Sequence, residues 1–251
     1  MTWSAEAEEI RRRRELALAH GGDAAVARQH EKGRLTIRER IDLLLDEGSF
    51  EEVGPAAGSV VRDEDGELVG FDPANFILGF GRINGQRVVV GGEDFTVRGG
   101  SPSPAGLRKS VYTEELALQY KLPLVRLHEG AGGSIGGTGG KGESLPGPVF
   151  ATPRFKSVAE CMATVPVATA ALGAVAGLPA ARLVASHFSV MSKATAQIMT
   201  AGPAVVERAM GEKTTKEELG GWKVHTKNGT VDNAGEDEAD SLAQIRRFLS
   251  Y

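Results

Sequence analysis

The spacing of apolar and polar positions changes along the chain, and these changes predict its elements. Residues 4–47 carry apolar side chains at helical intervals among charged ones and are expected to be helical. Thr36 followed by Glu39 has the form of a capping box, which predicts a helix from there through Leu45. Gly48 is expected to end this helix.

Beyond residue 58 the pattern changes to short apolar runs that turn residues separate. The sequence DEDG at 63–66 and the dipeptide Asn84-Gly85 each stand between two such runs. Asn-Gly in this setting is a strong hairpin signal. We therefore expect two hairpins, the second with strands over 76–83 and 87–90.

The rest of the chain alternates helical patterns with buried strands. The expected helices cover residues 104–120, 153–164, 202–210 and 236–250. The expected strands cover residues 123–128, 166–175 and 182–191. Strand pairs that alternate with helices indicate an α/β fold or a mixed sheet.

Composition and charge exclude several classes of protein. The 251 residues are 41% hydrophobic and 25% charged, as in ordinary soluble domains. A net charge of −4 argues against general nucleic-acid binding. A single cysteine excludes a disulfide scaffold and fits a reducing compartment. The longest apolar stretch, 165–179, is shorter than the ~20 residues that cross a membrane, and the N-terminus lacks the form of a secretory signal.

Glycine is the one unusual component, with 33 residues or about 13% against a usual ~7%. The densest run, HEGAGGSIGGTGGKGE, covers 128–143 and directly follows KLPLVRL at 121–127, which has the pattern of a buried strand. A glycine loop at the carboxyl end of a strand is a common ligand-binding position in α/β folds. The alternative is a surface loop without a ligand.

Side-chain chemistry of the familiar kinds is not found in the sequence. Gly140-Lys141 is followed by Gly142, so the phosphate-binding loop pattern fails. The histidines and Cys161 have no metal-ligand spacing, no G-x-S-x-G elbow is present, and no metal is expected. Cys161 is interpreted as a packing residue, and His187 as a core or site-wall residue.

Two turns of small residues remain as candidate chemistry, at 130–134 and 173–179. Each follows an expected buried strand, and small side chains leave the main-chain N–H groups open to a ligand. Such donors hold oxyanions, and loss of one commonly costs ~3–4 kcal/mol. The sequence therefore favours oxyanion or enolate stabilisation by the backbone. Close packing of a helix on a strand is the alternative for Ala176-Gly177.

Five segments together make the chain recognisable. They are ARQHEKGRLTIRERIDLLLDEGSFEEVG (27–54), GGEDFTVRGGS (91–101), LPLVRLHEGAGG (122–133), GAVAGLPAA (173–181) and TAGPAVVERAMGEKTTKEELGG (200–221). With them the chain resembles the carboxyltransferase (β) subunits of biotin-dependent acyl-CoA carboxylases, the propionyl-CoA and methylcrotonyl-CoA carboxylase group. Subunits of that family are longer, so the resemblance is to their N-terminal, acyl-CoA-side domain only.

The resemblance implies an α/β, ClpP/crotonase-like fold of repeated ββα units with an N-terminal helical segment. Residues 1–50 would be the helical segment, and 51–251 the crotonase-like domain. The implied reaction moves a carboxyl group between carboxybiotin and the α-carbon of an acyl-CoA through enolate intermediates. Two alternatives stay open: the carboxyltransferase subunit of a biotin-dependent acyl-CoA decarboxylase, and a non-catalytic assembly domain that binds CoA or a partner.

The resemblance also implies site residues, partners and location. The expected catalytic positions, at the oxyanion turns, are Ala131, Gly132, Gly133, Ala176 and Gly177. The expected substrate contacts are Arg98, Gly100, Lys109, Ser134 and Leu178, the two cations being candidates for CoA phosphates. Leu178 stands where the family has glycine, and Ser134 where propionyl-type members have arginine. Biotin would be carried on a partner subunit. The expected partners are a C-terminal carboxyltransferase domain or separate chain and a biotin carboxylase or carrier subunit, in an oligomer. The expected location is the cytoplasm or, in a eukaryote, the mitochondrial matrix.

Overall fold

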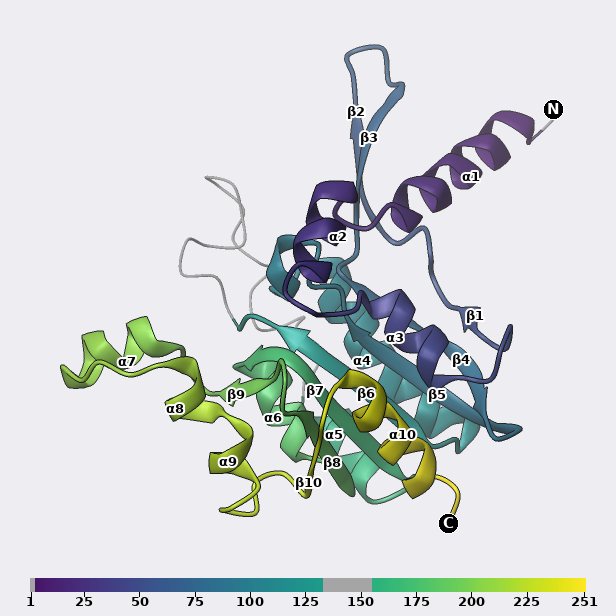
Figure 1. Cartoon of the computed structure of the whole chain (residues 1–251). Helices are drawn as coiled ribbons and strands as arrows, with labels where there is room; N and C mark the ends of the chain where they lie inside the picture. The colour runs from purple at the N-terminus through teal and green to yellow at the C-terminus, as the bar shows by residue number, and fades with distance from the viewer. Residues whose placement is uncertain (1–2, 133–154) are drawn as a thin grey trace.

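A mixed sheet of eight strands forms the centre of the molecule, and the computed structural model describes residues 3–132 and 155–251 of it (Figure 1). The strands are β1 (Glu51–Glu52), β4 (Phe76–Ile83), β5 (Gln86–Glu93), β6 (Leu124–Gly130), β7 (Val167–Ala176), β8 (Phe188–Ser192), β9 (Gln197–Met199) and β10 (Asn233–Gly235). Their order is β1-β4-β5-β6-β7-β8-β10. β9 pairs with residues 174–176 of β7, which follow the residues that pair with β8. β1, β4 and β5 pair antiparallel, whereas every pairing from β5 onward is parallel.

The N-terminal segment is helical, as its pattern predicts, with α1 (Ser4–Leu18), α2 (Asp23–His30) and α3 (Ile37–Leu44). The capping box is confirmed, because the Thr36 hydroxyl accepts a hydrogen bond from the Glu39 N–H while the Glu39 carboxylate accepts from the Thr36 N–H. The helix ends one residue earlier than expected, since Leu45 is already extended. α3 packs into the same core as the sheet, and the division at residue 50 stays a prediction.

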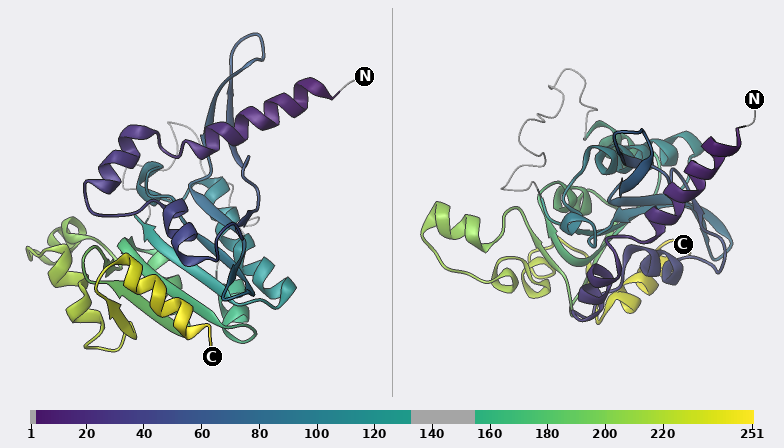
Figure 2. Two further views of the ribbon diagram at one scale, coloured as in Figure 1. Left: turned by 45° about the vertical axis from the view of Figure 1, so that its right-hand side comes forward. Right: turned by 90° about the horizontal axis from the view of Figure 1, so that it is seen from above.

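Both predicted hairpins are confirmed. β2 (Gly58–Arg62) and β3 (Leu68–Pro73) form a separate two-stranded sheet that projects from the body near α1 (Figures 1 and 2). The second hairpin joins β4 to β5 through Asn84 and Gly85, whose φ angles are 51° and 81°. Two consecutive positive φ angles define the type I′ turn that Asn-Gly favours.

The remaining elements that the sequence predicts agree with the structure except around residues 178–191. The helices are α4 (Pro104–Tyr120), α5 (Lys156–Met162), α6 (Leu178–Val184), α7 (Pro203–Met210), α8 (Lys216–Gly220), α9 (Trp222–His225) and α10 (Glu238–Phe248), with a 3₁₀ turn η1 at Arg98–Gly100. The strand expected over 182–191 was wrong before Phe188, because residues 182–184 belong to α6 and β8 begins only at Phe188. Gly177 turns the chain with a φ of 66°, and Pro179 stands in the first helical turn, where its ring favours a helix start. The sequence did not predict β1, β9, β10, η1, α8 or α9.

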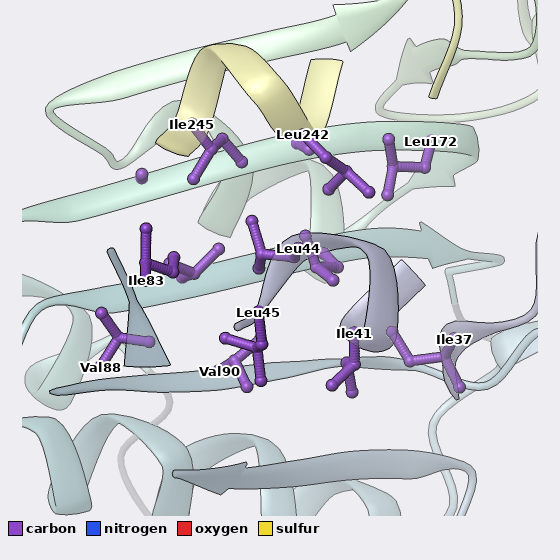
Figure 3. Close-up of a cluster of buried hydrophobic side chains, with 14 of the residues drawn as sticks. Ile37, Ile41, Leu44, Leu45, Ile83, Val88, Val90, Leu172, Leu242 and Ile245 are labelled. Carbon is purple, nitrogen blue, oxygen red and sulfur yellow. The ribbon is translucent and has the colours of Figure 1, made fainter. Parts of the chain in front are cut away.

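Apolar side chains fill the space on both faces of the sheet. On one face α3 and α10 cover the central strands, where Ile41, Leu44 and Ile245 are fully buried (Figure 3). On the other face α4 and α5 cover β4 to β7, and Cys161 is buried among them, which confirms its packing role. His187 lies outside the core, contrary to expectation: it is exposed before β8, where its Nδ1 accepts from the Val167 N–H. No helix among the described residues is both long and apolar enough to cross a membrane.

Candidate active site

The two small-residue turns meet at one edge of the sheet. β6 and β7 are parallel neighbours, with Gly130 paired to Val175, so the chain leaves both strands at the same end. A Cβ built on Gly177 would lie 3.0 Å from the Gly132 Cα, and one built on Gly132 would lie 3.4 Å from the Ala176 carbonyl oxygen. The structure thus brings together the predicted residues Gly132, Ala176 and Gly177.

The turn η1 brings a third segment to the same place. Gly100 has a φ of 66°, and a Cβ on it would lie 2.7 Å from the Glu129 carbonyl oxygen and 2.8 Å from the Gly130 Cα. Only glycine combines that backbone angle with so close an approach. We call the residues that meet here the glycine junction; they are Gly100, Gly130, Ala131, Gly132, Ala176 and Gly177.

Hydrogen bonds within the structure already engage two of the predicted donors. The Ala131 N–H donates to the Gly99 carbonyl at 3.0 Å, and the Gly177 N–H donates to the Met199 carbonyl at 3.3 Å. The N–H groups of Gly132 and Leu178 have no main-chain acceptor within residues 3–132 and 155–251. Among the described residues, Gly132 of the junction and Leu178 directly after it thus carry N–H groups without a main-chain acceptor, and the oxyanion role of the five positions stays a prediction.

The expected substrate-contacting residues are placed unequally. Gly100 belongs to the junction, and Leu178 begins α6 directly after it. Arg98 lies two residues before Gly100, half exposed and paired with the Asp72 carboxylate. Lys109 instead donates to the Gly54 carbonyl at 3.2 Å, before β2, and burial lowers the pKa of its ammonium to about 8. The expected contact of Lys109 with CoA phosphates stays a prediction.

Gly133 and Ser134 lie outside the described residues, so their expected roles stay predictions. Within residues 3–132 and 155–251, no cluster of three or more His, Cys, Asp or Glu side chains is placed to hold a metal ion.

A buried carboxylate anchors the end of β6 directly before the junction. Glu129 is fully buried, and its oxygens lie 2.7 Å from Arg40 Nη1 and 3.0 Å from Arg34 Nη1. Arg40 also binds both oxygens of Glu238 at 2.7 Å. Burial opposes the charge of Arg40, but its bonds to Glu238 and the charges of both carboxylates raise its pKa. This pairing ties β6 to α3 and to the start of α10.

On the opposite face of β6 a second buried polar cluster lies beneath the junction. His128 Nδ1 lies 3.0 Å from the Glu93 carboxylate. The Glu114 carboxylate lies 2.9 Å from Arg126 Nη2 and 3.1 Å from Arg182 Nε. Sequence reasoning missed this cluster. The run VRLHE offered a signal, because a buried strand seldom carries charged residues unless they are paired.

Known proteins are similar to this chain in sequence and in fold over nearly its whole length. A model of the carboxyl transferase domain matches residues 28–251. The propionyl-CoA carboxylase beta chain of Cereibacter sphaeroides is 34% identical over 247 residues, which are 97% of this chain and 47% of the relative. The mitochondrial propionyl-CoA carboxylase beta chain of Homo sapiens is 35% identical over 248 residues, 97% of this chain and 45% of the relative. The chain thus spans about half the length of these curated relatives.

Solved structures agree with these sequence relatives. A transcarboxylase 12S structure with methylmalonyl-coenzyme A and methylmalonic acid bound has a TM-score of 0.80 at 26% identity, covering 100% of this chain and 48% of that one. A single-chain, multi-domain long-chain acyl-CoA carboxylase also has a TM-score of 0.80, at 29% identity, covering 98% of this chain and 25% of that one. The resemblance seen in the sequence and the crotonase-like α/β fold expected from it are confirmed.

Proposed function

Because this chain belongs to the carboxyl transferase domain family, we propose that it is the acyl-CoA-binding half of a biotin-dependent carboxyltransferase. The proposed reaction moves a carboxyl group between carboxybiotin and the α-carbon of an acyl-CoA thioester. The observation that carries the proposal is the glycine junction, where the N–H of Gly132, and that of Leu178 directly after it, have no main-chain acceptor among the described residues.

The junction fits the chemistry that this reaction requires of a protein. Removal of a proton beside a thioester places negative charge on the thioester oxygen, and preorganised N–H groups stabilise such charge by ~3–4 kcal/mol per donor. The absence of side chains at Gly132 and Gly177 lets a substrate oxygen approach the backbone. The pairing of Glu129 with Arg34 and Arg40 holds the strand that presents this turn.

Biotin would reach this site on a partner and would carry the carboxyl group that is exchanged with the acyl-CoA. The half-length match to the relatives supports a partner that completes the site, either a C-terminal carboxyltransferase domain or a separate chain. We further propose that the assembly is oligomeric, includes a biotin carboxylase or carrier subunit, and works in the cytoplasm or in the mitochondrial matrix of a eukaryote.

Two measurements test this proposal, one on the purified chain and one after the partner is added. Isothermal titration with propionyl-CoA and butyryl-CoA should show binding, and labelled carboxyl transfer from methylmalonyl-CoA to free biotin should show turnover once the partner is added. Gly132→Pro removes one N–H and should lower transfer by about 10²–10³-fold. Gly132→Ala is the matched control, because it keeps the donor and its Cβ meets the Ala176 oxygen at an ordinary 3.4 Å. Equal activity of the two variants would refute the oxyanion role.

A second candidate is supported by the same half-length match: a non-catalytic assembly domain that binds CoA or a partner. Binding of acyl-CoA without transfer, even in the complex with the partner, would favour this candidate. Transfer by the complex that depends on the Gly132 N–H would exclude it.

A further inference from the structure

Two elements near the N-terminus project from the body of the molecule and are mostly exposed. α1 buries only Ala17 of its 15 residues, and every residue from 61 to 67 of the β2–β3 hairpin is exposed. Both elements extend away from the central sheet, in different directions (Figures 1 and 2). We call them together the N-terminal arm, which consists of residues 3–18 and 58–73.

Neither element of the arm has the packing that usually stabilises such an element. A two-stranded hairpin is at best marginally stable by itself in water, and so is a short helix without a packed face. β2 and β3 pair with each other and with no further strand of the described chain, so each has an open edge. Glu9 on α1 pairs with Arg62 on β2 at 2.6 Å, but both side chains are partly exposed, and such pairs contribute little. The arm therefore presents a surface that another chain can cover.

Large apolar side chains are exposed on the arm more often than on the rest of the described chain. Five of the 13 large apolar side chains that are exposed lie on the arm, although it is a small part of the sequence. They are Trp3, Ile10, Leu18, Val61 and Val69. Single exposed apolar residues are normal, but their concentration on two elements that lack a packed face indicates a contact surface.

The arm also carries opposite charges at two places. Residues 11–14 of α1 are four consecutive arginines, of which all but Arg13 are exposed. The hairpin turn DEDGE, at 63–67, carries four exposed carboxylates and no cation. Asp63 accepts from the N–H groups of Asp65 and Glu67 and so shapes the turn. In the described chain the ion pairs of these arginines are with Glu8 and Glu9 of α1 itself, and not with the turn.

The two charged places can satisfy each other between two copies of the chain. A two-fold contact uses the same surface of both copies, so that surface has to be complementary to itself. The arm meets this condition, because one surface holds both the arginines and the carboxylates. Two such contacts form at once, since each copy offers a turn and receives one.

We propose that the N-terminal arm is the contact between two copies of this chain, with the acidic turn 63–67 of each copy on the arginines 11–14 of the other. The contact would cover the exposed apolar side chains of the arm, and the opposite charges would fix its orientation. It forms whatever reaction the chain serves, so its test is independent of the proposed function.

The first measurement is sedimentation equilibrium of the purified chain, which should give at least twice the mass of one chain. The dissociation constant should rise at least about tenfold between about 0.1 M and about 1 M NaCl, because the Debye length falls from about 10 Å to about 3 Å. A monomer at low salt, or a dissociation constant that does not change with salt, would overturn the proposal.

Two charge-reversal variants then assign the contact to the arm, and each serves as the control of the other. The helix variant combines Arg11→Glu, Arg12→Glu and Arg14→Glu. The hairpin variant combines Glu64→Lys, Asp65→Lys and Glu67→Lys, and it keeps Asp63 because this carboxylate shapes the turn. Each variant alone should lose the contact, since like charges then face each other across the two-fold axis.

An equimolar mixture of the two variants should regain the contact, because both charge pairs are then opposite again, one of them reversed and one native. Circular dichroism of each variant shows that it is folded. Variants that keep the mass of the unaltered chain, or a mixture of folded variants that does not regain it, would overturn the proposal. A variant that does not fold leaves the decision to the mass and the salt dependence of the unaltered chain.

Discussion

Replacement of Arg40 by methionine tests whether the buried ion pairs hold the end of β6. Arg40 is 1% exposed and contacts Glu129, Glu238 and the Leu172 carbonyl, so its removal leaves two buried carboxylates without their shared partner. Loss of one partner from a buried pair costs about 3–5 kcal/mol. At about 2–4 °C per kcal/mol for a chain of this size, the melting temperature should fall by roughly 6–20 °C.

The assays are urea unfolding for the free energy and thermal melting for the melting temperature, both followed by circular dichroism, with Arg38→Met as the matched control. The Arg38–Glu52 pair also joins a guanidinium to a carboxylate, at 2.8 Å, but both side chains are partly exposed. Such pairs contribute about 0–1 kcal/mol. A loss in Arg40→Met no larger than that in Arg38→Met would refute the reasoning.

The pH dependence gives an independent check on the same variant. Without Arg40, Glu238 loses the hydrogen bonds and the charge that lower its pKa, so burial raises the folded-state pKa of this carboxyl further above that of the unfolded chain. A group with a raised folded-state pKa stabilises the fold below its unfolded pKa and loses that contribution as the pH rises. The gap in unfolding free energy between Arg40→Met and the unaltered chain should therefore widen from about pH 4 to pH 7.

Three further predictions follow from single residues. Burial lowers the pKa of Lys109 from 10.5 to about 8, so the unfolded chain binds more protons between these values, and the free energy of unfolding should rise with pH there. Lys109→Met should lose that rise in urea titrations. Gly177→Ala should cost more than the roughly 1–2 kcal/mol of its positive φ, because its Cβ would also meet Gly132. Gly211→Ala, with a φ of 73° and no neighbour within 4 Å, should cost only the backbone strain, and equal losses in urea titrations would contradict the close packing. Burial raises the pKa of Cys161 to about 11, so a thiol reagent should react only after unfolding, and rapid reaction of the native chain would contradict this placement.

Local signals accounted for most of the secondary structure. The capping box at Thr36 and the turn at Asn84-Gly85 depend on hydrogen bonds and backbone angles within a few residues, so the sequence alone was sufficient there. Residues 182–191 were different, because an apolar run that short fits a strand or a buried helix equally well. In the structure, α6 makes contacts with distant elements, such as the ion pair of Arg182 with Glu114 on α4, which the local sequence does not indicate.

The sequence by itself determined the order of most elements, the two small-residue turns and the family to which they belong. Only the tertiary structure decided that these turns meet, because their contact depends on the parallel pairing of β6 with β7 rather than on local geometry. It also decided which N–H groups are available, since the Ala131 donor is taken by Gly99 from a different segment. The pairing of Glu129 with Arg40 likewise joins positions far apart in the chain, and burial makes such pairing obligatory without indicating the partner in advance.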